Sequence, residues 1–244
     1  MINTAVILAA GLGSRLKNRT KDKPKGFLEL EGKSLIERSV DNLLSVGISK
    51  IYIGTGYLSE VYDKFSDNYP QIETIKSYKY ETTSSMYTLY NMSKVIKDDF
   101  LLLESDLLYE IDALNQLIDD ETKDVILSSG KTSSNDEVFI ETDDNSNLVG
   151  MSKNRSELKS VDAELVGISK VSLERYKLMN KYFEQVSGEK PKIDYEYIFV
   201  QSTKEKDLYV KKVEELIWCE IDDVNHEKRA LESILPKINA KERI

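Results

Sequence analysis

The chain has 244 residues, 40% of them hydrophobic, which is enough to build one good-sized core, so we expect a single domain. No stretch approaches the ~20 apolar residues of a membrane-spanning helix, and the first predicted strand starts too close to Met1 to leave room for a signal peptide. The net charge of −9 argues against general nucleic-acid binding, and the single cysteine, Cys219, excludes an internal disulfide and suits a reducing cytoplasm.

The first predicted element is a strand that ends in a sharp turn. Residues Val6–Leu8 are an apolar run rich in β-branched side chains, which is typical of a strand buried on both faces, and Ala9–Ala10 keep its end narrow. Gly11, Gly13 and Ser14 then let the backbone turn tightly and come close to a ligand. Exposed backbone N–H groups in such a turn form a concave binding site for an anion.

Two cationic side chains, Arg15 and Lys25, accompany this turn. An acidic protein that binds a polyanion must gather positive charge locally, so the strand, the turn and the two cations predict a site for a nucleoside triphosphate. The dinucleotide fingerprint is excluded because Leu16 stands where it needs a third glycine, and the P-loop sequence Gly-Lys-Ser/Thr is absent. The alternative is an ordinary strand-to-helix turn with a surface arginine and lysine.

The next segments alternate between strands and helices. Residues 29–33 predict a tight turn, and Ser34 with Glu37 forms a capping box at the start of a helix that Gly47 ends. A second strand at 50–56, a helix at about 59–65 and a short strand at 72–75 follow. This order predicts a parallel sheet with right-handed crossovers.

A hydroxyl-rich loop and a second carboxylate-bearing strand end come next. Residues 82–86 open a helix that runs to about residue 95, and Ser84 or Ser85 is suited to cap it. Residues 100–103 form the most apolar predicted strand, which runs directly into Glu104 and Asp106. Open α/β sheets bind ligands at the carboxyl ends of their strands, so we expect these carboxylates at a ligand site.

The second part of the chain has a looser pattern. We expect about residues 1–130 to form a nucleotide-binding half, and about 131–244 an acceptor-side half with a closing helix, within one domain. The predicted elements are a helix at 112–118, a strand at 125–128, three antiparallel strands over the nucleotide half at 137–141, 148–152 and 164–168, a helix at 173–186, a strand at 208–213, an extended segment at 218–222 and a helix at 224–235.

The whole string from Leu8 to Leu16, followed by Lys23-Pro24-Lys25, resembles the signature of nucleotidyltransferases that activate sugars and small phosphorylated alcohols. The chain is most similar to the cytidylyltransferases for phosphocholine or 2-aminoethylphosphonate, at residues 54–57, 85–87 and 104–109. The resemblance covers almost the whole chain. It implies a Rossmann-like, mainly parallel α/β sheet flanked by helices, of the GT-A-like nucleotidyltransferase type, with a smaller antiparallel sheet on the acceptor side.

The resemblance also implies roles for individual residues. Asp106 and Asp222 would hold Mg²⁺, Lys25 would neutralise the α-phosphate or the acceptor oxygens, and Arg15 would grip the β- and γ-phosphates. The alternatives are that Asp106 is a turn or cap residue and that Asp222 caps the last helix. The predicted nucleotide-binding residues are Leu8, Ala9, Ala10, Gly11, Gly13, Ser14, Arg15, Lys25, Ser84 and Ser85.

The acceptor substrate needs partners for a cationic end and an anionic end. Aromatic faces suit a quaternary ammonium, whereas carboxylates suit a primary ammonium with three N–H donors. Lys153 is a candidate for the anionic end, unless it is simply a solvated lysine, and the only histidine, His226, is expected to face solvent. The predicted acceptor-binding residues are Tyr109, Lys153, Asp194, Tyr195 and Glu196.

The reaction implied by the resemblance is Mg²⁺-dependent transfer of CMP from CTP to 2-aminoethylphosphonate, with release of pyrophosphate. Phosphocholine is the second choice of acceptor, a sugar 1-phosphate the third, and a regulator that binds nucleotide without catalysis is the non-enzyme alternative. We expect a cytoplasmic protein with no nucleic-acid or membrane partner. The oligomeric state stays open, with a homodimer among the alternatives.

Overall fold

Strand β1 (Thr4–Ala9) lies in the middle of a nine-stranded sheet in the computed structural model, which describes residues 2–242. All six residues of β1 are buried, as a strand flanked by helices on both faces requires. Because side chains alternate between faces, Ala5 and Ile7 enter one hydrophobic cluster and Val6 and Leu8 enter another. The predicted central buried strand is therefore confirmed.

The sheet is mixed, and the part that the N-terminal strands form is parallel. Strands β5 (Ile72–Lys76), β4 (Lys50–Thr55), β1 and β6 (Phe100–Glu104) run parallel in that spatial order. Strand β11 (Ala163–Val171) then pairs antiparallel with β6. The remaining strands continue from β11 along two branches, β8 (Val125–Ser129) with β12 (Tyr209–Val213), and β9 (Phe139–Thr142) with β10 (Leu148–Ser152).

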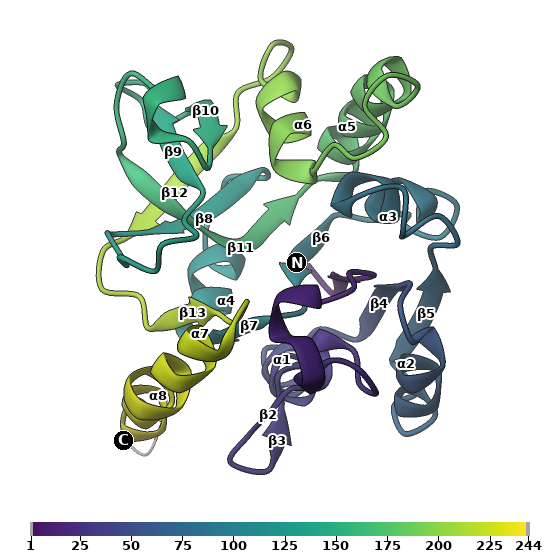
Figure 1. Ribbon diagram of the computed structural model, residues 1–244. Coiled ribbons are helices and arrows are strands. Elements are labelled where there is room, and N and C mark those ends of the chain that lie inside the picture. Colours follow the sequence, from purple (N-terminus) through teal and green to yellow (C-terminus); the bar gives the residue numbers. More distant parts are fainter. Residues whose placement is uncertain (1, 243–244) are drawn as a thin grey trace.

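Helices cover the two faces of the sheet (Figure 1). One cluster of buried side chains joins the sheet to α1 (Leu35–Ser45), α2 (Ser59–Ser66) and α4 (Asp112–Ile118). A second cluster joins the opposite face to α3 (Ser85–Asn91), α5 (Leu173–Val186) and α6 (Tyr195–Ser202). This three-layer arrangement leaves the carboxyl ends of β1 and β6 at one open edge of the sheet, where the loops that follow them meet.

Two small antiparallel ribbons and the C-terminal helices complete the described chain. Strands β2 (Glu29–Leu30) and β3 (Lys33–Ser34) form one ribbon, and β7 (Leu107–Tyr109) with β13 (Trp218–Glu220) forms the other. Short 3₁₀ turns lie at Ser14–Arg19, Lys25–Phe27 and Arg155–Glu157. After β13 come α7 (Val224–Arg229), a π-helical segment (Ala230–Ile234) and α8 (Leu235–Lys241).

The structure differs from the sequence-based expectations in three details of an otherwise confirmed α/β fold. Strands β9, β10 and β11 extend the main sheet instead of forming a separate sheet over it, because β11 pairs directly with β6. Helix α3 ends at Asn91, and the turns that follow continue to about residue 96. The last helical region continues past Leu235 with a π-helical segment ahead of Pro236, whose missing N–H disrupts the regular α-helical bonding.

Among the described helices, we find none with the length and apolar character needed to cross a bilayer.

The capping box at the start of α1 gives a stability prediction. The Ser34 hydroxyl accepts a hydrogen bond from the Glu37 N–H at 3.3 Å, and the Glu37 carboxylate accepts one from the Ser34 N–H at 2.7 Å. Replacing Ser34 with Ala leaves a helix N–H without its partner, which costs about 0.5–2 kcal/mol. Urea unfolding should show this loss for Ser34→Ala. Ser45→Ala at the exposed end of the same helix is the control, and an equal loss in both variants would contradict the assignment.

Candidate functional site

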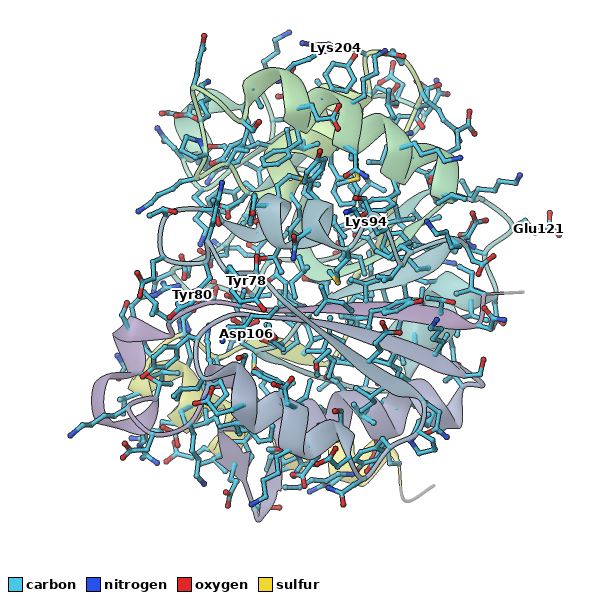
Figure 2. All side chains as sticks on the ribbon, turned by 90° about the vertical axis from the view of Figure 1, so that its right-hand side faces the viewer. Tyr78, Tyr80, Lys94, Asp106, Glu121 and Lys204 are labelled. Atoms are coloured by element: carbon cyan, nitrogen blue, oxygen red, sulfur yellow. The ribbon has the colours of Figure 1, made fainter. Side chains whose placement is uncertain are left out.

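A cavity of about 470 Å³ opens at the carboxyl ends of β1 and β6. Every residue predicted to bind nucleotide lines it: Leu8, Ala9, Ala10, Gly11, Gly13, Ser14, Arg15, Lys25, Ser84 and Ser85. Asp106 and Asp222 line it as well. Figure 2 shows Asp106 at the same end of the sheet as Tyr78 and Tyr80, and Tyr80 contributes to the cavity wall. The structure thus brings four distant segments of the chain around one space.

The glycine turn after β1 is held in a shape that only a small residue permits. Gly13 has a φ of +61°, and a Cβ atom there would lie 3.1 Å from the Thr20 side chain and 3.3 Å from Lys25 Cβ. The Gly13 carbonyl accepts hydrogen bonds from Leu16 N–H at 3.1 Å and from the Thr20 hydroxyl at 2.9 Å. The turn therefore folds back over the segment that carries Lys25.

Lys25 is the centre of the charged groups in this cavity. Its ammonium donates hydrogen bonds to Asp106 Oδ2 and to Asp222 Oδ1, and Glu220 Oε1 lies 3.9 Å away. Burial alone would lower the pKa of Lys25, but the charges of Asp106, Asp222 and Glu220 outweigh it and raise the pKa well above its ordinary value. Lys25 is therefore a permanent cation that lies between two carboxylates from distant segments of the chain.

The pairing of β7 with β13 explains how these two carboxylates meet. Leu107 is opposite Glu220 in the ribbon, and the Ile221 N–H donates to the Asp106 carbonyl oxygen at 3.0 Å. Each aspartate therefore lies next to the end of one strand of the pair. Asp222 is 3% exposed and does not cap α7, because Asp223 accepts the N–H bonds of Asn225 and His226 instead. The helix-cap alternative for Asp222 is excluded by this geometry.

Arg15 reaches Asp222 from the exposed side of the cavity. Its guanidinium forms an ion pair with Asp222 Oδ1 at 2.6 Å and another with Asp136, and its side chain is 56% exposed. Burial would raise the pKa of Asp222, but the charge of Lys25 and the hydrogen bond that Lys25 donates help to lower this pKa to about 2. Asp222 is thus a carboxylate at neutral pH, with cations on two sides.

Glu104 and Glu220 form the back of the cavity. Burial raises the pKa of both carboxyl groups well above the ordinary range, and the nearby charge of Asp106 raises them further. Gly167 on β11 makes room for Glu104, since a Cβ there would lie 3.1 Å from its carboxyl carbon. One oxygen of each of Glu104, Asp106 and Glu220 can lie within 4.8 Å of the others, as can those of Asp136, Glu220 and Asp222.

These carboxylates are suited to a hard divalent cation. Asp106 Oδ1 and Asp222 Oδ2 are both buried and have no hydrogen-bond partner, while their other oxygens contact Lys25. A buried carboxylate oxygen without a partner is costly, and Mg²⁺ favours carboxylate oxygens as ligands. The orphaned oxygens and the all-oxygen donor set therefore fit a metal ion held by Asp106 and Asp222.

A second, smaller cavity of about 60 Å³ adjoins the first, and Glu104 and Glu220 line both. Lys153 and Glu196, two of the predicted acceptor-binding residues, line this smaller cavity. The Lys153 ammonium pairs with Asp136 Oδ1 at 2.9 Å, so it is not a freely solvated lysine. Glu196 Oε2 is buried without a hydrogen-bond partner. Glu104 and Glu220 thus form a wall that the two cavities share, and we name this pair of residues the carboxylate partition.

The other three predicted acceptor-binding residues are placed differently. Tyr109 is 3% exposed and belongs to the core cluster beside α1, so it lines neither cavity, because alternation along β7 turns it away from the Asp106 side. Tyr195 is also in the core, where its hydroxyl donates to Glu104 Oε1 at 2.6 Å. Asp194 lines the larger cavity and accepts hydrogen bonds from Ser84 and Ser85.

Several site residues were missed by the sequence analysis. Asp136 lies in a polar loop that gave no motif, and only the tertiary fold places it against Arg15 and Lys153. His226 was expected to face solvent, but it is half-buried, and its Nε2 lies 3.0 Å from the Ser134 carbonyl oxygen. Glu104, by contrast, was expected at a ligand site, because it ends the strand two residues before Asp106.

The chain is similar to known proteins along most of its length. The MobA-like NTP transferase domain family matches residues 5–151. A CTP:phosphoglutamine cytidylyltransferase from Campylobacter jejuni is 29% identical over 89% of this chain and 95% of its own length. A 2-aminoethylphosphonate cytidylyltransferase from Lancefieldella rimae is 29% identical over 38% of each chain. The solved structure of a Streptococcus pneumoniae CTP:phosphocholine cytidylyltransferase superposes with a TM-score of 0.81 and 25% identity, covering 95% of this chain and 99% of that one.

The family match covers more than half of the chain, including the glycine turn, Lys25 and Asp106. The similar proteins extend the match to 89% and 95% of the chain. The chain therefore belongs to the MobA-like NTP transferase family and is a nucleotidyltransferase.

Proposed function

We propose that the protein transfers CMP from CTP to a small acceptor that carries a phosphonate or phosphate at one end and a primary ammonium at the other, with 2-aminoethylphosphonate as the first choice. The similar cytidylyltransferases support CTP as the donor. The observation that carries the choice of acceptor is the smaller cavity, whose lining is rich in carboxylates and poor in aromatic rings.

The charge balance of the larger cavity bears on how a triphosphate would bind. Among the described residues that line it are six carboxyl groups and three cationic side chains, Arg15, Lys25 and Lys192. A triphosphate would be repelled by this excess of negative charge unless divalent cations enter with it. Mg²⁺ held by Asp106 and Asp222 would supply this neutralisation and would polarise the α-phosphate. Phosphate oxygens would then replace carboxylate oxygens as partners of Arg15 and Lys25.

The chemistry places few other demands on the chain. An oxygen of the acceptor phosphonate attacks the α-phosphorus of CTP, a new P–O bond forms, and the bond to pyrophosphate breaks with its electron pair. The attacking oxygen is already an anion, so no general base is needed. Catalysis by the chain consists of positioning the two anions and stabilising the charge that develops between them. Lys25 would neutralise charge at the α-phosphate, and Arg15 would stabilise the leaving pyrophosphate.

The smaller cavity suits a primary ammonium. Of the described residues that line it, six carry carboxyl groups, and Trp218 is the only one with a Trp, Tyr or Phe ring. A quaternary ammonium is recognised by several aromatic faces, which this lining does not offer, whereas a primary ammonium donates three hydrogen bonds that carboxylates accept. Glu196 Oε2 is buried and unpartnered there, and is therefore the oxygen most in need of a donor.

Replacing Lys25 tests the charge assigned to the reacting phosphate. Lys25→Ala should lower kcat roughly 10²–10³-fold, because an interaction that strengthens as charge develops is lost, while CTP affinity changes much less. Steady-state kinetics at saturating CTP and Mg²⁺, with CTP binding measured by calorimetry, separates the two effects. Lys23→Ala is the matched control, since Lys23 is 56% exposed and pairs only with the exposed Glu29 among the described residues. A Lys25→Ala variant within a few-fold of wild-type turnover contradicts the assignment.

Replacing the two aspartates tests the proposed metal ligands. Asp106→Asn and Asp222→Asn should each abolish Mg²⁺-dependent turnover, because an amide keeps the shape of the side chain but removes the charge that a hard cation needs. Circular dichroism should show that both variants stay folded, and Asp119→Asn, at the exposed end of α4, should behave as wild type. If either site variant keeps normal activity and metal dependence, its residue is not a metal ligand.

Acceptor selectivity tests the function as a whole. The kcat/KM for 2-aminoethylphosphonate should exceed that for phosphocholine by about tenfold or more, since an unpaired buried polar group costs about 1–3 kcal/mol. Glu196→Gln should reduce this preference. Pyrophosphate release is measured with CTP and each acceptor in turn, with phosphoglutamine and glucose 1-phosphate as two further acceptors. The kcat/KM values then rank the acceptors. Faster turnover of phosphocholine or phosphoglutamine would assign the acceptor to those substrates, and a leading hexose 1-phosphate would reject a cationic acceptor.

The same glutamate predicts a pH dependence. Burial, and then the charge of Asp194, raise the pKa of Glu196 to about 7. A carboxyl group with a raised pKa becomes charged only as the pH rises through that value, so ammonium binding should strengthen from about pH 6 to about pH 8. Phosphonates also titrate near neutrality, so the profiles of wild type and Glu196→Gln are compared. Superimposable kcat/KM profiles would show that Glu196 is not the titrating group.

A further inference from the structure

Three hydroxyl side chains in a row form part of the larger cavity, and we name them the hydroxyl wall: Thr83, Ser84 and Ser85. Asp194, which immediately precedes α6, lines the same cavity beside them. A hydroxyl group can donate one hydrogen bond and accept two. Whether this wall offers hydrogen atoms or lone pairs to a ligand therefore depends on where the three hydroxyl hydrogens are already used.

All three hydrogens are used within the protein. The Ser84 and Ser85 hydroxyls both donate to Asp194 Oδ1, the second at 3.0 Å, and an ionised carboxylate has no hydrogen to donate in return. The Thr83 hydroxyl donates to the Lys79 carbonyl oxygen at 2.7 Å. The Ser85 oxygen also accepts the Tyr195 N–H at 3.0 Å. The hydroxyl wall therefore presents only lone pairs to the cavity.

The contact between Asp194 and Ser84 replaces local bonds that both side chains normally make. Each residue immediately precedes a helix, Asp194 before α6 and Ser84 before α3, where an aspartate or a serine ordinarily accepts a hydrogen bond from a helix N–H. Neither makes such a cap bond. Both turn to each other across a separation of 110 residues. The tertiary fold, and not local helix capping, thus determines the orientation of both groups.

We infer that Asp194 determines the choice of base, by fixing Ser84 as a hydrogen-bond acceptor for the 4-amino group of cytosine and against the 4-oxo group of uracil. This inference rests on the proposed use of CTP. Cytosine carries a donor at position 4 and uracil carries an acceptor there. The cytosine amino group can donate a hydrogen bond to a lone pair of Ser84. The uracil oxygen would instead face the Ser84 oxygen, and these two acceptors would lose their hydrogen bonds to water without a replacement. Sites that hydrogen-bond one substrate group discriminate strongly against an analogue that cannot make the bond.

The test is the ratio of kcat/KM for CTP to that for UTP, with Mg²⁺ and 2-aminoethylphosphonate held constant, and with CTP and UTP binding measured by calorimetry without the acceptor. Asp194→Ala frees the Ser84 hydroxyl to donate, so the ratio should fall about tenfold or more, mainly through a gain with UTP. In the double variant Asp194→Ala with Ser84→Ala the freed Ser84 donor is gone, so the UTP gain should disappear even though the Ser85 hydroxyl is also freed. If Asp194 had only a structural role, its replacement would lower kcat/KM for CTP and for UTP alike. Asp144→Ala, in the exposed loop between β9 and β10, is the matched control.

Each other outcome overturns the inference in an identifiable way. An unchanged ratio in Asp194→Ala, or a UTP gain that persists in the double variant, shows that Ser84 does not read position 4. Lys192 is an exposed donor that lines the same cavity, and loss of selectivity in Lys192→Ala would transfer the discrimination to that ammonium. A wild-type protein that prefers UTP contradicts the role of Asp194 but leaves nucleotidyl transfer intact. A wild-type protein that binds neither nucleotide overturns the proposed function and this inference together.

Discussion

The ammonium of Lys25 between Asp106 and Asp222 is the interaction on which the rest of the site depends. Two buried carboxylates side by side repel each other strongly in a low-dielectric interior, and the cation makes their approach possible. The β7–β13 ribbon also holds the two aspartates together, because its pairing fixes the backbone at both of them. The proposed metal ion and triphosphate would enter by exchanging partners with Lys25, since the charges that they need are already gathered there.

The side of the site that faces α6 depends on a buried network at the far end of that helix. Arg175 on α5 is fully buried and donates to the Ser202 hydroxyl and to the Lys206 carbonyl, each at 2.8 Å. These bonds fix the C-terminal end of α6 against α5. The N-terminal end of α6 then places Asp194 beside the serines and Tyr195 beside Glu104. A structural arginine therefore contributes indirectly to the geometry of both cavities.

The carboxylate partition between the cavities has a physical consequence for how the binding of one proposed substrate would affect the binding of the other. Glu104 and Glu220 line both spaces, and burial together with the charge of Asp106 raises the pKa of each. Cations on either side of the partition favour its charged form. A metal-bound nucleotide in the larger cavity and an ammonium in the smaller one would thus stabilise the same carboxylates. Binding of the two proposed substrates would thereby be coupled through shared charge.

The sequence alone determined the central strand, the glycine turn, the capping box of α1 and the assignment to the nucleotidyltransferases. These features are local: each depends on the spacing of apolar residues, on a backbone shape that glycine permits, or on side chains a few residues apart, as with Ser34 and Glu37. The residues predicted to bind nucleotide follow the same logic, because the carboxyl ends of neighbouring parallel strands must meet at one edge of the sheet.

Only the tertiary structure decided the contacts between distant segments. It placed Asp136 against Arg15, turned Tyr109 into the core, moved Asp194 to the nucleotide side, and inserted β11 beside β6. Those outcomes depend on strand register and on which face a side chain occupies, and a shift of one residue reverses them without changing the local pattern.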